Sequence, residues 1–172
     1  MKNIFNYIFV AFLLFACKSN SQDKKNEKSG LNEQLTNMNR MMVENESKRI
    51  DDFIAAHNFK AVKTGTGLRY EIYKKGTGKK PENHSEVEIK FKVYLLNGTL
   101  CYSSDSLGTA KFTLGYDEQV RGLEEGLMLM VPGDKAHLIV PAHLAYGLSG
   151  DRNKITPGKA LYYDVELIKI IK

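Results

Sequence analysis

Three short blocks between Gln119 and Leu167 carry side chains that could together act on a substrate. In chain order they are QVRGLEEGL, PAHLAYG and YYDVEL. Each brings aliphatic or aromatic groups, and they contain no nucleophile beside a base and no ligand cluster for a metal. A hollow lined by such groups can act only through shape, exclusion of water and a few hydrogen bonds.

The polar residues elsewhere do not supply a conventional catalytic site. Glu124 and Glu125 are neighbours on a predicted helix and point about 100° apart, so they cannot face each other as an acid–base pair. Cys101 falls in a buried strand pattern and is expected to be a small core residue rather than a nucleophile. No histidine has ligand spacing to another His or Cys, so we predict neither a metal site nor a cofactor. The histidines are His57, His84, His137 and His143.

The N-terminus predicts export from the cytoplasm. A basic start, Met1-Lys2-Asn3, precedes an apolar run from Ile4 to Phe15. That run is shorter than the roughly 20 residues that a bilayer-spanning helix needs, and it is typical of a signal peptide over residues 1–16. The sequence LFAC resembles a bacterial lipobox, which implies cleavage before Cys17 and a lipid-modified Cys17 anchored to an envelope membrane. The alternative is an uncleaved anchor that happens to hold a cysteine.

Composition indicates one ordinary globular domain with an appendage. The chain has 172 residues, of which 42% are hydrophobic and 26% charged. Its net charge of +5 is spread along the sequence. The pairs Lys74-Lys75 and Lys79-Lys80 are too short to form a nucleic-acid-binding stripe, so no nucleic-acid partner is predicted.

Two segments should precede the folded domain. Residues 17–30 are polar and lack large apolar side chains after Cys17, which predicts a flexible tether. Over residues 31–58, Leu31, Leu35, Met38 and Met42 recur at helical spacing, and a second apolar stretch follows at Ser47–His57. This helical stripe could pack on its own domain or form a homodimer.

The remaining segment, residues 66–172, is rich in strand patterns. Apolar residues alternate from Val87 to Leu95, which predicts a half-buried strand. Asn97-Gly98 predicts a tight hairpin. Other strands are expected at Leu68–Ile72, Thr99–Tyr102, Lys111–Leu114, Ala136–Val140 and Leu161–Ile171.

One helix should lie across this sheet. Val120, Leu123 and Leu127 form its core stripe, and Asp117 is expected to cap its N-terminus. Gly122 and Gly126 leave another face without bulk, so that the sheet backbone can approach. A mostly antiparallel sheet with one helix across it is an α+β fold.

These features together resemble the FKBP-type peptidyl-prolyl cis-trans isomerase family. The likeness rests on the Asn97-Gly98 hairpin, FTLG from Phe112, VRGLEEG, PAHLAYG and YYDVEL, all in order. It implies a twisted antiparallel sheet wrapped on a short helix, with a proline-binding pocket between them. The lipobox, the helical preamble and TGTGLRYEIYKKGTG from Thr64 also resemble FKBP-type lipoproteins associated with gliding motility.

The resemblance implies a role for each residue of the pocket. Leu123 would be the floor, the Val120 N–H and the Tyr146 hydroxyl would hold substrate carbonyls, and proline-containing exported polypeptides would be the substrates. The walls of the substrate-binding pocket would be Phe91, Phe112, Ile155 and Tyr163.

The resemblance is weaker on one wall. Cys101-Tyr102 stands where the family usually has Phe-Asp, Ala110 sits where a large aromatic residue is common, and Gln119 replaces a usual aliphatic residue. These changes should loosen this wall. The leading hypothesis is an isomerase that assists the folding of exported proteins. The alternatives are a weakly active or inactive chaperone or assembly module, for gliding or envelope machinery, and a dimeric scaffold.

Overall fold

The computed structural model describes residues 21–117 and 119–171, with side chains from Asn32 onward. The predicted signal peptide and Cys17 lie outside the described residues. The chain divides into two compact units, with the boundary between Glu44 and Asn45. No helix in the described ranges is both long and apolar enough to cross a bilayer.

A single long helix, α2, extends over Ser21–Ala56. Residues 21–30, which we expected to belong to a flexible tether, are helical, and their Lys, Glu and Gln residues favour this conformation. In the first unit Leu35, Met38 and Met42 are all about half exposed. In the second unit the last turns of α2 are buried, since Ile50 and Phe53 are 0% and 8% exposed.

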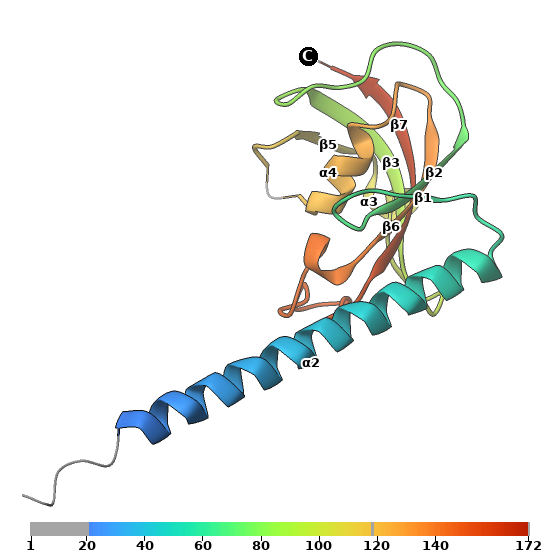
Figure 1. Cartoon of the computed structure of the whole chain (residues 1–172). Helices are drawn as coiled ribbons and strands as arrows, with labels where there is room; N and C mark the ends of the chain where they lie inside the picture. Colours follow the sequence, from blue (N-terminus) through green and yellow to red (C-terminus); the bar gives the residue numbers. More distant parts are fainter. Residues whose placement is uncertain (1–20, 118, 172) are drawn as a thin grey trace, which may run out of the picture. The chain divides into compact units, whose positions relative to one another are not determined.

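The second unit is built on one antiparallel sheet with the strand order β1-β2-β6-β7-β3-β4, and β5 pairs with β3 (Figure 1). The predicted antiparallel α+β architecture is confirmed. The hairpin at Asn97-Gly98 is also present, with Gly98 at φ +86°. The strands are β1 (Val62–Lys63), β2 (Arg69–Lys74), β3 (Glu86–Leu95), β4 (Leu100–Ser103), β5 (Ala110–Thr113), β6 (Lys135–Val140) and β7 (Leu161–Ile170).

Strand β3 has β7 along one edge and two short strands, β5 and β4, along the other. Its first half pairs with β5 and its second half with β4, while its whole length pairs with β7. Between the two short partners the Phe91 N–H donates to the Ser104 hydroxyl at 3.1 Å instead of to a strand carbonyl. Ser104 begins the short helix α3 (Ser104–Leu107). The strand pairing on this edge of β3 is therefore interrupted beside Phe91.

Each face of the sheet packs against a helix. On the inner face Leu138 and Val140 of β6 belong to the main core together with Leu123 and Leu127 of helix α4 (Arg121–Leu127). On the outer face Ile139 packs with Ile50 and Phe53 of α2. Adjacent residues of β6 therefore hold different helices, as the alternation of side chains along a strand requires.

Helix α4 differs from prediction at its start. It begins at Arg121, and the residue before it, Val120, makes no side-chain cap. The expected capping residue, Asp117, is one helical turn too early, and its carboxylate instead accepts the Thr113 N–H at 2.6 Å. Asp117 therefore closes the turn after β5 and does not cap the helix.

The two glycines of α4 allow close packing on β6. We expected the sheet backbone to approach them, but the groups that contact them are side chains. A methyl group at Gly122 would collide with Val140, and one at Gly126 would collide with Leu138. Helix α4 is thus held against β6 at a separation that only glycine permits.

Candidate active site

An apolar hollow of about 220 Å³ lies between α4 and the inner face of the sheet. Leu123 from α4 and Tyr163 from β7, both buried, line it. Tyr146 lies at its edge, about one third exposed, after the short 3₁₀ helix η1 (Ala142–Leu144). The lining residues are Ile89, Phe91, Val93, Tyr102, Leu107, Ala110, Phe112, Gln119, Val120, Leu123, Tyr146 and Tyr163.

Eight of the ten residues that the sequence predicted for the pocket line this hollow, although they come from six different segments of the chain. Cys101 and Ile155 do not line it; both are 2% exposed and are buried elsewhere in the main core. The eight are Phe91, Tyr102, Phe112, Gln119, Val120, Leu123, Tyr146 and Tyr163.

Ala110, whose small side chain was expected to loosen one wall, also lines the hollow. Three other lining residues were not predicted: Ile89, Val93 and Leu107. The alternation of β3 could have revealed the first two, since Ile89 and Val93 share a face with Phe91. Leu107 is different. It is 67% exposed at the end of α3, and nothing in its sequence context indicates a position at the hollow.

The two tyrosines at the edge of the hollow differ in their hydrogen bonds. The Tyr102 hydroxyl donates to the Asp151 carboxylate, so this hydroxyl is already engaged within the protein. Within the described part of the chain, the Tyr146 hydroxyl has no protein partner, and it can therefore donate to a bound group.

Burial keeps the hydroxyls protonated. It raises the pKa of Tyr146, and the negative charge of Asp151 adds to the effect. It also raises the pKa of Tyr163 strongly. The hydrogen bond to Asp151 raises the pKa of Tyr102, with burial second. These phenols are therefore hydrogen-bond donors at neutral pH and not bases.

The Cys101 thiol is not suited to nucleophilic chemistry. Burial raises its pKa, so the reactive thiolate is disfavoured. In the described ranges no cluster of three or more His, Cys, Asp or Glu residues could hold a metal ion.

The glutamates of α4 fasten two loops around the hollow. Glu124 accepts the Gly115 N–H at 2.9 Å. Glu125 accepts the Thr66 hydroxyl at 2.8 and 2.7 Å through its two oxygens. The Thr66 carbonyl oxygen lies 3.0 Å from Nε2 of His143 in η1. Thr66 therefore links Glu125 of α4 to the segment that carries Tyr146.

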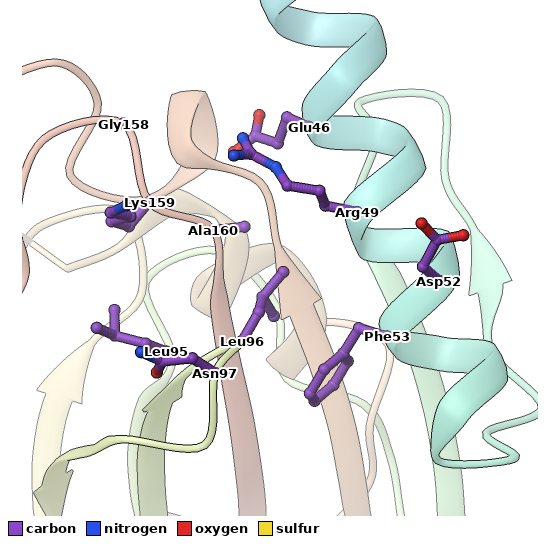
Figure 2. A pocket seen from close by; sticks show the side chains of 10 residues that line it. All are labelled: Glu46, Arg49, Asp52, Phe53, Leu95, Leu96, Asn97, Gly158, Lys159 and Ala160. Atoms are coloured by element: carbon purple, nitrogen blue, oxygen red, sulfur yellow. The ribbon is translucent and has the colours of Figure 1, made fainter.

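A second cavity, of about 370 Å³, lies beside the last turns of α2 (Figure 2). Phe53, Leu96 and Ala160 form an apolar base, and both signs of charge stand on its rim. None of the predicted pocket residues lines it. Its two acidic groups are already engaged: Glu46 accepts the Ala142 N–H, and Asp52 pairs with Lys48. The smaller apolar hollow is therefore the candidate active site.

Comparison with known proteins agrees with this geometry. A family model described as FKBP-type peptidyl-prolyl cis-trans isomerase matches residues 77–168, which is more than half of the chain. The chain belongs to the FKBP-type peptidyl-prolyl cis-trans isomerase family.

Individual relatives share the domain but are mostly longer. The probable FKBP-type peptidyl-prolyl cis-trans isomerase FkpA of Neisseria meningitidis is 36% identical over 107 residues, which are 62% of this chain and 39% of that protein. The outer membrane protein MIP of Legionella longbeachae is 32% identical over 136 residues, 78% of this chain and 58% of that protein. The crystal structure of FkpA from Escherichia coli matches with a TM-score of 0.65 and 26% identity, over 95% of this chain and 78% of that one.

Proposed function

We propose that this protein catalyses the cis–trans isomerisation of X–Pro bonds in exported polypeptides. The observation that carries the proposal is the apolar hollow, which gathers Leu123, Phe112 and Tyr163 around a space that admits a proline ring. The family to which the chain belongs supports the same reaction.

The mechanism requires no reactive group. Rotation about an X–Pro bond faces a barrier of about 18–20 kcal/mol because amide resonance must be broken. The twisted amide is less polar than the planar one, so a dry apolar site binds it more tightly and lowers the barrier. Leu123 and Tyr163 would exclude water from the amide, while the Tyr146 hydroxyl and the Val120 N–H would hold neighbouring carbonyls.

An assay of the purified protein tests the proposal. A short proline peptide should convert from cis to trans faster than the uncatalysed exchange. Tyr146→Phe removes one hydrogen bond and should lower kcat/KM about three- to tenfold with unchanged thermal stability. A wild-type rate equal to background would refute isomerase activity.

A second candidate function is favoured by the wall at Tyr102. Its hydroxyl is engaged by Asp151, so this wall offers one donor fewer to a substrate. The protein would then be a binding module, a chaperone or assembly factor for envelope machinery, that uses the same hollow. Peptide binding without acceleration of isomerisation would support this function.

The N-terminal sequence supports a location at an envelope membrane, facing the periplasm or the cell surface. In this proposal Cys17, at the end of the lipobox-like LFAC, is the site of lipid attachment. The Legionella relative is itself described as an outer membrane protein. Cys17→Ser should release the protein from the membrane fraction, and unchanged fractionation would refute the anchor.

The first half of α2 supports a homodimer. Leu35, Met38 and Met42 are about half exposed at helical spacing, which suits a second helix. Met38→Lys should halve the mass in solution, while Asn39→Lys should leave it unchanged. A truncation for the same purpose should stop at Glu44, because Ile50 is part of the core. A monomeric wild type would exclude both the dimer and the scaffold function.

A further inference from the structure

The wall of the hollow beside Tyr102 is fastened to a distant loop. Tyr102 lies on β4, and Asp151 lies in the loop between η1 and β7. The Tyr102 hydroxyl donates to one oxygen, Oδ2, of the Asp151 carboxylate. The two residues are 49 positions apart in sequence, so this hydrogen bond sets the position of the loop relative to the strand.

The other oxygen of Asp151 is held by its own loop. Oδ1 accepts the N–H groups of Asn153 and Ile155, both at 2.8 Å. The Asp151 N–H donates to the Ile155 carbonyl at 3.0 Å, and the Ile155 side chain is buried in the core. The carboxylate is therefore oriented before it meets Tyr102, and the loop keeps it so without the phenol.

Lys154 adds a second link between the same two elements. Its ammonium donates to the Cys101 carbonyl on β4 at 2.8 Å. It also lies 5.2 Å from the centre of the Tyr102 ring, within the range of a cation–π contact. The Tyr102 ring is thus fixed at its hydroxyl by Asp151 and at its face by Lys154.

We propose that Asp151 is a positioning residue of the isomerase site, which acts through Tyr102. By accepting the phenol hydrogen, its carboxylate holds the ring in the wall of the hollow and turns the donor away from the substrate. Tyr146 is then the tyrosine that donates to a bound substrate. This inference rests on the proposed function, because it concerns the same hollow.

A double-mutant cycle tests whether Asp151 acts through Tyr102. Tyr102→Phe removes the hydroxyl but leaves the hydrogen bonds inside the loop. Asp151→Asn keeps the shape of the side chain, but its amide nitrogen cannot accept the phenol hydrogen. The amide would donate to the phenol oxygen instead, and the phenol hydrogen would no longer be held away from the substrate. Each single variant should lower kcat/KM about tenfold, and the double variant should be no worse than either one.

A second pair of residues provides a matched control. Tyr73 donates to Asp164 at 2.7 Å, and Asp164 alternates with the inward-facing Tyr163, so this pair is on the outer face of the sheet. Tyr73→Phe and Asp164→Asn remove the same type of hydrogen bond and should leave kcat/KM unchanged.

Two outcomes would overturn the inference: losses that multiply in the double variant, or an Asp151→Asn variant with wild-type activity. The same single and double variants are also compared in their affinity for the proline peptide. The loss of affinity should be non-additive in the same way as the loss of kcat/KM. If the wild type binds but does not isomerise, the proposed function fails while the binding cycle still tests Asp151. Hydrogen exchange of the Ile155 N–H distinguishes these losses of activity and affinity from unfolding of the loop. The Ile155 N–H should stay protected in Tyr102→Phe, because its bond to Asp151 remains.

Discussion

Adding one methyl group at Gly122 should disturb both the packing of α4 and the position of Tyr146. The new carbon would collide with one methyl of Val140 and lie 3.2 Å from the other. It would also lie 3.3 Å from the Cβ of Leu144, which belongs to η1, two residues before Tyr146. Val140 is fully buried and branched at Cβ, so it has little freedom to turn away.

The net effect is the difference between two opposing terms. Overpacking in a core costs about 1–3 kcal/mol. Replacing glycine by alanine in a helix gains at most about 1 kcal/mol, and less near the helix end where Gly122 lies. The free energy of unfolding should therefore fall by about 1–2 kcal/mol, which lowers Tm by roughly 5 °C in a unit of this size.

Thermal unfolding and the isomerase assay measure the two consequences of Gly122→Ala. Activity should fall more than the small loss of folded protein explains, since η1 is pushed with the segment that holds Tyr146. The control is Gly65→Ala, where a new methyl group meets nothing within 4 Å. A Gly122→Ala variant with wild-type stability and activity would refute the close contact between α4 and β6.

Three further predictions concern the outer face of the sheet and the loop. Ile50→Ala should lower the free energy of unfolding by about 3 kcal/mol in urea titrations, because Ile50 is 0% exposed between α2 and β6. Burial lowers the pKa of His137 below 6.5, so the unfolded chain takes up the proton first and stability should fall as the pH decreases below this value. His137→Phe should flatten this dependence of Tm between about pH 7.5 and 5.5. Burial tends to raise the pKa of Asp151, but hydrogen bonds from Tyr102 and the loop amides outweigh this effect and keep the pKa low. The pKa of Asp151 should therefore rise in Tyr102→Phe, which a carboxyl titration followed by NMR would measure.

Local patterns predicted the parts of this molecule that local chemistry decides. The alternation in β3 and the Asn97-Gly98 turn are backbone preferences within a few residues, and both are found. The resemblance carried by the ordered blocks implied most of the residues that line the hollow, because the family fold sets which side chains face the pocket. Asp117 shows the limit, since a capping residue depends on where the helix starts, and the pattern left that uncertain by a full turn.

Contacts between distant residues could not be predicted in the same way. Nothing near Asp151 in the sequence indicates a tyrosine partner on β4, because the contact depends on how a loop folds back across the sheet. The burial of Ile50 is similar: helical spacing indicated an apolar stripe, but its partner, Ile139, follows only from which face of β6 each residue occupies.

The place of β7 in the sheet has a consequence for how the chain folds. This strand lies between β6 and β3, although it comes later in the sequence than both. Its pairing with β3 joins residues such as Val87 and Ile170, so the loop closed by this contact contains most of the domain. Pairing over such a separation is slow, because chain entropy is lost before the contacts form. The sheet therefore cannot be completed before β7 has been synthesised, and β3 and β6 lack this shared partner until then.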